Sequence, residues 1–379
     1  MKIQFIYVWR LDKEKGIEHL IYATEKLIKN NMVFALHIYG KGQYDEEVQQ
    51  LASEHPNHVH YYGWMKKNDI IPYWKTMDFF IMPSQFLETF GLTACESLLC
   101  WVPVIGNKKW WLIPFIDNTL NLQSAPGSTD GEKLVHIMKS LITHTTTKDH
   151  FSSLIKQTQT SYSKTTRYGQ IQALLPEKEP VLYISDYINY NGGGIETHIH
   201  DSIKFLWQQD HDTKLYWHQA PTWKFVLLKK LAVMAISIFN IPDTIKIKKK
   251  IKKWKTWLIR RHSISRVIGW LPVACSDHNN QIISHHELGL FHPYPSKTHE
   301  LDHIPKAWSL SSFIQAWNSK NPIIVASIIG KFCLVRLIHK QLKKKVKTHI
   351  VPSERMIDMV KQRHPYANVV CIPHFVDIE

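Results

Sequence analysis

The stretch DFFIMPSQFLETFGLTACESLLCWVPVIG, residues 78–106, contains one complete strand–helix–strand unit. Residues 78–84 form an apolar run that is typical of a buried strand, and residues 102–106 form another. Between them, residues 90–100 carry apolar side chains at helical spacing. Two buried strands joined by a helix predict a βαβ unit, in which the two strands are parallel.

The residues before this stretch repeat the same alternation. Strand-like segments are expected at 3–9, 34–40 and 59–63, and segments of helical periodicity at 16–30 and 69–77. Several of the strand-like segments end in Gly or Ser. This pattern predicts a parallel, doubly wound sheet. In such sheets ligands bind beyond the carboxyl ends of the strands, so the residues that follow each strand are the first candidates for a site.

A second α/β pattern follows a polar helical region and a short linker, PEKEP, at 176–180. Its strands and helices are expected at 181–187, 198–209, 213–219, 347–353, 354–364 and 369–377. The predicted fold class is therefore α/β with two Rossmann-like domains, residues 1–175 and 180–379. Each domain is expected to hold a parallel sheet with helices on both faces.

The composition of the 379 residues is that of a globular protein, with 44% hydrophobic residues. The net charge of +15 favours an anionic partner such as a nucleotide, a nucleic acid or a membrane surface. Five scattered cysteines form no CxxC pair, which predicts a reducing, cytoplasmic setting and no metal site. Met1 leads directly into a strand-like run, so no signal peptide is expected.

Two glutamates, Glu88 and Glu96, flank the predicted start of the helix within 78–106. The backbone amides of Phe90, Gly91 and Leu92 would lie at its amino terminus, where free N–H groups and the helix dipole attract anions. Carboxylates for sugar hydroxyls beside amides for a diphosphate suit a nucleotide sugar. The alternative is structural, because the dipole alone favours a glutamate near a helix start.

Cations and glycines follow other strands of the first half. Arg10 and Lys15 come directly after the first strand, where they could bind a diphosphate or simply be solvated. Gly40 and Gly63 end the next two strands, where a base or ribose could approach the backbone closely.

In this order, these motifs resemble the donor-binding, carboxyl-terminal domain of family 4 glycosyltransferases over residues 4–106. The resemblance implies a GT-B architecture and retaining transfer from a nucleotide-diphosphate sugar, with no metal or other cofactor required. It implies that Arg10 and Lys15 hold the diphosphate, that Glu88 meets the donor sugar and that Glu96 meets the ribose. Two bulky residues, Trp9 and Trp101, stand where the family usually has glycine, and either ring could narrow the phosphate loop.

Residues 181–206, VLYISDYINYNGGGIETHIHDSIKFL, resemble the first strand, loop and helix of the family's acceptor-binding domain. Gly193 and Gly194 lie in its glycine-rich loop, which could pass close to a ligand. The resemblance makes His299 the candidate that lines the reacting face. His278 is a weaker candidate, because most of the 23 histidines are expected to be structural or exposed.

The two resemblances stand in the reverse of the family's order. One explanation is a circular permutation, which is physically allowed because the termini of compact domains often lie close together. The other is the tail of one transferase followed by the head of the next. The first predicts an enzyme that glycosylates a glycan or lipid-linked acceptor in cell-envelope synthesis. The second allows a non-catalytic pair of domains that binds nucleotide or membrane.

The segment 243–261, DTIKIKKKIKKWKTWLIRR, contains nine Lys or Arg residues and one Asp. Its apolar residues Ile247, Ile251, Trp254 and Leu258 fall on one face of a helix, which predicts a membrane-surface element over 245–261. The alternative is a helix that packs this stripe on its own domain. The first reading predicts a protein peripheral to the inner membrane face. No motif for specific nucleic-acid binding accompanies the basic run.

Overall fold

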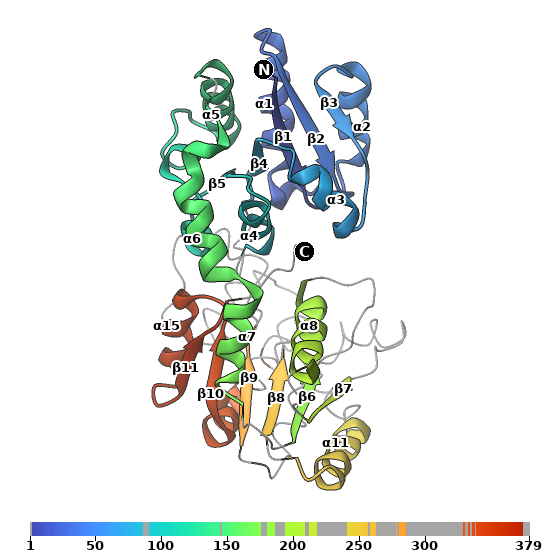
Figure 1. Cartoon of the computed structure of the whole chain (residues 1–379), viewed down its shortest axis with the longest axis vertical. Helices are drawn as coiled ribbons and strands as arrows, with labels where there is room; N and C mark the ends of the chain where they lie inside the picture. The colour runs from blue at the N-terminus through green and yellow to red at the C-terminus, as the bar shows by residue number, and fades with distance from the viewer. Residues whose placement is uncertain are drawn as a thin grey trace. The chain divides into compact units, whose positions relative to one another are not determined.

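Residues Met1–Thr166 and Arg167–His374 form two units of the chain. Within them, the computed structural model describes residues 2–85, 91–144, 146–175, 180–185, 194–208, 212–217, 241–256, 258–262, 278, 280–285, 329, 333, 336–337 and 339–373. The boundary between the units falls inside α7 (Lys164–Gln172). Each unit contains one parallel sheet, and Figure 1 shows the helices that accompany each sheet.

The first sheet has five parallel strands in the order β3-β2-β1-β4-β5. Its strands and the helices between them follow the alternation expected from the sequence: β1 (Ile3–Val8), α1 (Ile17–Lys29), β2 (Phe34–Tyr39), α2 (Asp45–Glu54), β3 (Val59–Tyr61), α3 (Lys67–Trp74), β4 (Phe79–Met82), α4 (Leu92–Leu99) and β5 (Val104–Gly106). Every residue of β4 is buried, as the apolar run that contains it predicts. The parallel, doubly wound arrangement of this unit is thereby confirmed.

Three further helices complete the first unit: α5 (Asp130–His144), α6 (Ser152–Tyr162) and the start of α7. The first unit also contains short 3-10 turns. Turn η1 (Lys13–Lys15) lies between β1 and α1, η2 (Trp110–Phe115) and η3 (Asn118–Leu120) lie between β5 and α5, and η4 (Lys148–Phe151) lies between α5 and α6. The sequence pattern missed α2. That helix buries only Val48 and Leu51, so its apolar stripe is too narrow to stand out from a polar loop.

Strand order places a topological switch point between β1 and β4. The chain leaves β1 toward β2 and β3 on one side and then crosses back to β4 and β5 on the other. Right-handed crossovers in opposite directions place their helices on opposite faces of the sheet. The loops after β1 and β4 therefore lie at the topological switch point, and the carboxyl edge at such a point is where open α/β sheets bind ligands.

The second sheet has six parallel strands in the order β11-β10-β9-β8-β6-β7. Its described elements are β6 (Val181–Ser185), α8 (Gly194–Gln208), β7 (Thr213–Trp217), α11 (Ile241–Lys253), β8 (Leu258–His262), β9 (Gln281–Ser284), β10 (Val346–Val351), α15 (Glu354–Arg363) and β11 (Asn368–Cys371). The predicted α/β class with two parallel sheets flanked by helices is confirmed.

Candidate functional site

Backbone hydrogen bonds join the loops at the carboxyl edge of the first sheet. The Trp9 amide donates to the Tyr39 carbonyl at 3.1 Å, which continues the ladder of β1 and β2 beyond the strands. The Gly40 amide donates to the Gly63 carbonyl at 2.8 Å. The predicted residues Gly40 and Gly63 therefore lie side by side, next to the loop that carries Arg10.

The switch point is closed by an approach between Gly16 and Pro83. Gly16 ends η1 with φ +76°, and a Cβ atom added to it would lie 2.1 Å from the Pro83 carbonyl oxygen. The Gln85 amide donates to the Glu14 carbonyl at 3.0 Å across the same junction. The loops after β1 and β4 are thus fixed to each other, because position 16 has no side chain.

Arg10 points into solvent and is paired with carboxylates of its own loop. Its side chain is 59% exposed, and its guanidinium lies 2.6 Å from Asp12 and 2.7 Å from Glu14. Exposed ion pairs of this kind exchange readily for another anion because they contribute little free energy. Arg10 can therefore reach a diphosphate only in competition with these two carboxylates.

Lys15 is buried, and its ammonium lies over the ring of Trp9, 4.5 Å from the ring centroid. This cation–π contact holds the lysine at the carboxyl end of β1. The ring of Trp9, the bulky residue expected to narrow the phosphate loop, thus contacts the predicted phosphate-binding lysine directly. The tryptophan shapes the loop around Lys15.

Helix α4 begins as expected at Leu92, immediately after Gly91. Gly91 has φ +81°, and a Cβ there would lie 2.4 Å from the Leu112 side chain, so the close entry into α4 requires glycine. The amides at this helix start form the expected anion-attracting end. Glu88 and Phe90 lie outside the described residues.

Glu96 lies in the second turn of α4, and its carboxylate is 2.8 Å from the ammonium of Lys67 at the start of α3. Only 16% of the glutamate side chain is exposed. Burial raises the pKa of the Glu96 carboxyl, and the Lys67 ammonium opposes that shift. The sequence pattern did not suggest Lys67, which is 29 positions away in the chain.

Trp101 does not crowd the candidate site, which corrects the expectation that it could. It follows α4 and precedes β5, so it lies at the amino edge of the sheet, opposite the loops described above. Its φ of +66° is in the left-handed region, and its amide donates to the Leu98 carbonyl at 3.0 Å. Position 101 follows the end of helix α4, where glycine commonly adopts the left-handed conformation, and Trp101 adopts that conformation here.

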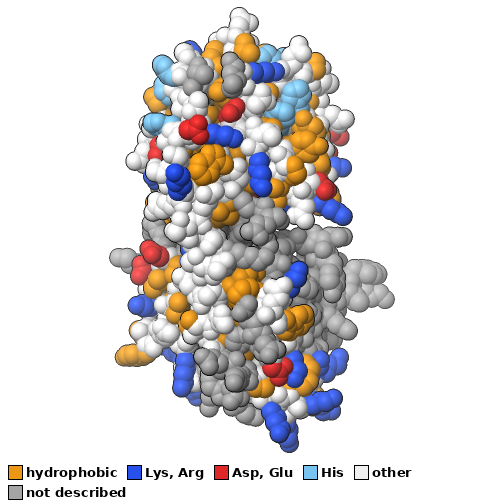
Figure 2. Space-filling view, viewed as in Figure 1, with side chains coloured by type: hydrophobic (Ala, Val, Ile, Leu, Met, Phe, Trp, Pro, Cys, Tyr) orange, Lys and Arg blue, Asp and Glu red, His pale blue; other side chains and the backbone are white. Residues whose placement is uncertain are grey.

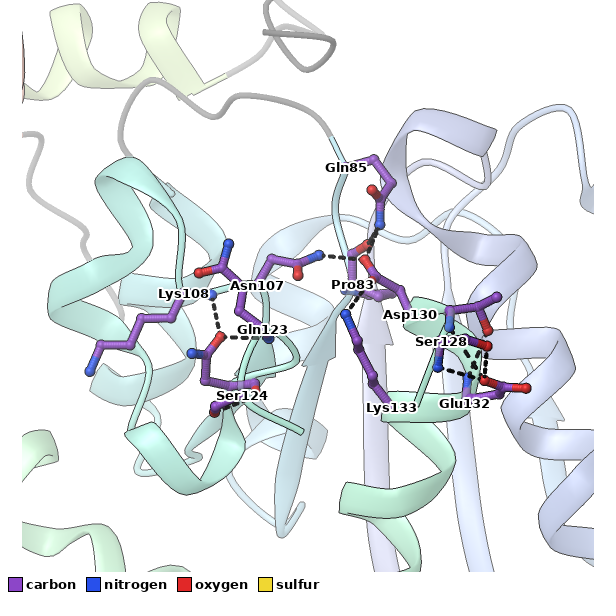
Figure 3. Close-up of polar contacts among 12 residues, drawn as sticks. Pro83, Gln85, Asn107, Lys108, Gln123, Ser124, Ser128, Asp130, Glu132 and Lys133 are labelled. Atoms are coloured by element: carbon purple, nitrogen blue, oxygen red, sulfur yellow. Dashed lines mark hydrogen bonds and ion pairs between the residues drawn. The ribbon is translucent and has the colours of Figure 1, made fainter. Parts of the chain in front are cut away.

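Asp130 ties together the loops after β4 and β5, and Figure 3 shows its contacts. Its carboxylate accepts hydrogen bonds from the side-chain amides of Gln85 and of Asn107, the second at 3.0 Å. Asn107 also donates to the Ser84 carbonyl at 3.2 Å. Burial raises the pKa of Asp130, but the hydrogen bonds from Gln85 and Asn107 and the charges of His19 and Lys133 together lower it below the ordinary value.

Sequence reasoning missed Asp130, although a local signal marks its position. Thr129 and Glu132 form a capping box at the start of α5: the Glu132 amide donates to the Thr129 hydroxyl at 3.2 Å. The Glu132 carboxylate in turn accepts from the Ser128 amide at 2.7 Å and from the Thr129 amide at 3.3 Å. This motif could have located the helix start, but not the contacts of Asp130 with distant loops.

A hollow of about 440 Å³ lies elsewhere in the first unit, beside β5. Polar side chains from η3, the following loop and α5 line it, including Asn118, Asn121, Ser124 and His136. None of the residues predicted from sequence lines this hollow.

In the second unit, α8 begins at Gly194, so the glycine-rich loop leads into a helix as predicted. Gly193 and His299 lie outside the described residues. His278 is described, and its carbonyl accepts a hydrogen bond from the Gln281 side chain. Within the described ranges, no group of three or more His, Cys, Asp or Glu side chains is arranged to hold a metal ion.

The basic segment differs from its predicted form. Helix α11 ends at Lys253, and Leu258 belongs to β8, so 243–261 is not one helix. Ile247 is buried against Leu182 and Ile259, and Ile251 and Trp254 pack on the same cluster. The apolar stripe thus packs on its own unit, as the alternative interpretation predicted, and contact of this segment with a membrane surface stays a prediction.

The lysines of α11 remain near the surface, and Figure 2 shows Lys and Arg side chains gathered at that end of the second unit. Among the described helices, none combines the length and the apolar character that crossing a bilayer would need.

Comparison with known proteins agrees with the geometry of the first unit. Residues 1–110 match the family of glycosyl transferases group 1. The matched segment contains β1 to β5, the switch point, Arg10, Lys15 and both glutamates.

Two curated relatives match part of the chain. An uncharacterized 41.2 kDa protein in the cps region of Klebsiella pneumoniae is 31% identical over 145 residues, which is 38% of each chain. A GDP-mannose-dependent monoacylated alpha-(1-6)-phosphatidylinositol monomannoside mannosyltransferase of Corynebacterium glutamicum is 30% identical over 106 residues, covering 26% of this chain and 28% of that protein. This chain therefore spans less than two fifths of the length of either relative.

Among solved structures, Anabaena Alr3699/HepE in complex with UDP is similar with a TM-score of 0.38 and 20% identity. The similarity covers 45% of this chain and 48% of that one. The carboxyl-terminal domain of a glycosyl transferase group 1 protein from Francisella tularensis has a TM-score of 0.36 and 17% identity, over 42% of this chain and 84% of that one. Similarity at this level says nothing about activity.

Proposed function

We propose that this chain transfers a sugar from a nucleotide-diphosphate donor to a glycan or lipid-linked acceptor, with retention of configuration. One observation carries the proposal: Arg10, Lys15 and the start of α4 follow the two strands that flank the switch point. The sequence match to glycosyl transferases group 1 covers the same residues. Cations and helix-end amides at a switch point suit a diphosphate.

In this proposal, Arg10, Lys15 and the amides of 90–92 stabilise the charge that develops on the leaving diphosphate. Stabilisation of developing charge by fixed donors is usually the largest electrostatic contribution to catalysis. Glu88 orients the donor sugar, and Glu96 accepts hydrogen bonds from the ribose.

The nucleotide base and ribose approach the sheet where Gly40 and Gly63 lie side by side. Their hydrogen bond of 2.8 Å brings the two strand ends together. Gly40 is buried against the Trp9 carbonyl, so the half-buried Gly63 is the position that a ligand could approach. The mannosyltransferase relative is GDP-mannose-dependent by name, and the Anabaena protein was solved with UDP, so both bases are reasonable probes.

The second unit supplies the acceptor side in this proposal. The glycine-rich loop with Gly193 and Gly194 approaches a ligand, and His299 lines the reacting face. As part of the same proposal, the chain is a family 4 glycosyltransferase. Its two halves stand in the reverse of the family's order, either by circular permutation or by a tandem arrangement. A phosphatidylinositol mannoside acceptor in the name of one relative supports a lipid-linked acceptor in cell-envelope glycan synthesis.

We further infer attachment to an anionic membrane face from the cytoplasm, but through charge alone. Because Ile247 of α11 is buried in its own unit, the exposed side of the helix, which carries Lys248 and Lys249, is the side that can meet a surface. Attraction of this kind falls steeply with ionic strength, whereas insertion of an apolar face would not.

A second candidate function is nucleotide binding without turnover. The observation that favours it is the pairing of the predicted cations: Arg10 is held by Asp12 and Glu14, and Lys15 lies over Trp9. If these contacts persist with nucleotide present, the diphosphate is bound weakly and the leaving group is not stabilised.

Calorimetric titration of UDP and GDP into the full chain tests the proposal, together with a turnover assay on a panel of nucleotide sugars. We expect binding of one nucleotide, turnover with its sugars, and loss of binding in Lys15→Ala. Lys29→Ala, an exposed lysine at the end of α1, is the matched control. Binding with no turnover, unchanged in Glu88→Gln, would favour the second candidate, and absence of binding would reject both.

A further inference from the structure

One face of the first sheet is only partly covered, and histidine and tyrosine side chains occupy the open part. The strand registers place Phe80, Ile6, His37 and His60 in one row across β4, β1, β2 and β3. Aligned residues of neighbouring strands point to the same face. Phe80 and Ile6 are fully buried, whereas His37 and His60 are partly exposed. This face of the sheet therefore becomes accessible to solvent toward the β3 edge.

The order of the strands explains this opening. The connections from β1 to β2 and from β2 to β3 run in one direction, so right-handed crossovers put α1 and α2 together on the opposite face. On this face, Trp74 of α3 packs on Phe80, with ring centroids 5.1 Å apart. With eight residues, α3 is only about 12 Å long at 1.5 Å per residue, too short to shield β2 and β3 as well.

The open part carries a set of contacting rings, those of His37, Tyr39, His60 and Tyr62. Together with Gln4 and Tyr73 beside them, we call this set the β2–β3 ladder. The rings of Tyr39 and Tyr62 are stacked, with centroids 4.6 Å apart and planes within 8°. The rings of His37 and His60 are 4.9 Å apart. Figure 2 shows histidine and hydrophobic side chains side by side on the surface over β2 and β3.

Hydrogen bonds lock the polar atoms of the ladder. One ring nitrogen of His37 lies 2.9 Å from the Gln4 side-chain oxygen, and the other lies 3.1 Å from the Tyr62 hydroxyl. Tyr62 and Tyr73 nevertheless remain 46% and 56% exposed. The ladder therefore presents fixed ring faces with hydrogen-bonding edges beside them.

The ladder is electrically neutral near pH 7. Burial, the neighbouring His60 and Lys2 together lower the pKa of His37 to about 4, and burial and Lys2 lower the pKa of His60. Burial raises the pKa of both Tyr39 and Tyr62, so their hydroxyl groups stay protonated. Lys2 is the one cation acting on these histidines among the described residues.

We propose that the β2–β3 ladder binds a neutral glycan chain, outside the donor site at the carboxyl edge. A sugar ring has apolar C–H faces and a rim of hydroxyl groups, and it matches aromatic faces flanked by uncharged donors and acceptors. Nucleic acids, anionic lipids and acidic peptides would need a cluster of cations, whereas Lys2 alone acts on the ladder histidines among the described residues. The choice of a glycan rests on the proposed glycosyl transfer.

Ligand-observed NMR titration of the full chain with neutral heptaoses of glucose, galactose and mannose tests this proposal. We expect one of them to bind without nucleotide, and to bind roughly tenfold more weakly to Tyr62→Ala, which loses one stacked ring and one hydrogen bond. His60→Ala should bind more weakly as well. Tyr22→Ala is the matched control, because Tyr22 is a similarly exposed tyrosine on α1.

Parallel titration with UDP and GDP separates this proposal from the proposed function. Nucleotide binding with no heptaose binding, or with equal heptaose affinity in wild type and Tyr62→Ala, would overturn the glycan site alone. Light scattering measures the oligomeric state and tests whether a second copy of this chain covers the ladder instead. A dimer that Tyr62→Ala converts to a monomer would assign the ladder to a protein interface and overturn the proposal. Heptaose binding that the tyrosine variant weakens supports it even if no nucleotide binds.

Discussion

The ammonium of Lys67 lies 2.8 Å from the carboxylate of Glu96, so a cation from α3 already holds the glutamate that is proposed to meet the ribose. The pair is unequal: the lysine side chain is 39% exposed and the glutamate 16%. A buried carboxylate beside a half-exposed ammonium is costly to keep ionised, because the ammonium is solvated and the carboxylate is not.

Replacing Glu96 with Gln should separate stability from binding. Because the folded pKa of Glu96 lies above its ordinary 4.5, ionisation makes folding less favourable as pH rises above that value. We therefore expect Glu96→Gln to raise the thermal midpoint at pH 7 more than at pH 4. The same variant should weaken nucleotide binding by about 1.5–3 kcal/mol, the contribution of a charged hydrogen bond. Glu25→Gln, at an exposed position of α1, should change neither the thermal midpoint nor nucleotide affinity.

Removing the carboxylates that hold Arg10 should tighten nucleotide binding. Glu14→Gln and Asp12→Asn each leave the guanidinium with one fewer competing anion. We expect roughly two- to fivefold higher affinity for the nucleotide diphosphate at low salt, the scale of an exposed ion pair, and less at high salt. Asp149→Asn changes the net charge equally and serves as control. If Glu14→Gln binds as wild type does, Arg10 does not meet the diphosphate.

Gly16→Ala should destabilise the first unit and distort the site. The added Cβ would lie 2.1 Å from the Pro83 carbonyl oxygen, at a φ of +76° that alanine rarely adopts. We expect a loss of at least about 2 kcal/mol in the free energy of unfolding, from left-handed strain and overpacking together. Gly169→Ala is the contrasting variant. It lies in α7 with nothing within 4 Å of the added Cβ, and it should gain about 0.5–1 kcal/mol.

Asp130→Ala should loosen the loop that leads from β4 into the candidate site. It leaves the side-chain amides of Gln85 and Asn107 without their shared acceptor, which costs about 1–3 kcal/mol when such groups stay buried. Hydrogen exchange at the amides of Ser84 and Gln85 should accelerate, and nucleotide affinity should fall. Glu132→Ala removes only the helix cap and should cost stability without changing exchange at Ser84 and Gln85.

Four histidines of the second unit form a buried chain of ring contacts. His285 and His349 lie 2.9 Å apart at their ring nitrogens, and His339 and His364 lie 2.8 Å apart. The rings of His349 and His364 connect the two pairs at 4.9 Å. Burial and the neighbouring rings lower the pKa of His349 to about 4, and burial with several nearby cations lowers that of His364 to about 3.

This cluster should make the second unit sensitive to acid. The lowered pKa values keep His285, His349 and His364 neutral in the fold, whereas the unfolded chain binds protons below about pH 6.5. Stability is therefore complete above pH 6.5 and falls as pH drops toward 4, by on the order of 3 kcal/mol for one such histidine. Hydrogen exchange of the β10 amides between pH 7.5 and 4.5 measures this loss. His349→Phe should flatten the profile, and His144→Gln, at an exposed position, should not.

Local patterns in the chain determined most of the first unit. Helix α1 and strands β1 to β5 could be predicted because their periodicities are written in consecutive residues, and Gly91 marked the start of α4. Arg10 and Lys15 could be placed at the carboxyl edge because a residue that follows a parallel strand lies there whatever the rest of the chain does. Helix α2 was not predicted because its two buried residues do not form a recognisable apolar stripe.

Only the tertiary structure decided what those residues touch. Lys67 with Glu96, and Asp130 with Gln85 and Asn107, are joined by crossover connections that no local pattern encodes. The buried stripe of α11 has the same periodicity whether a sheet or a membrane covers it. Periodicity specifies that a face must leave water, because burial of apolar area is non-directional; the strand order specifies which surface receives it.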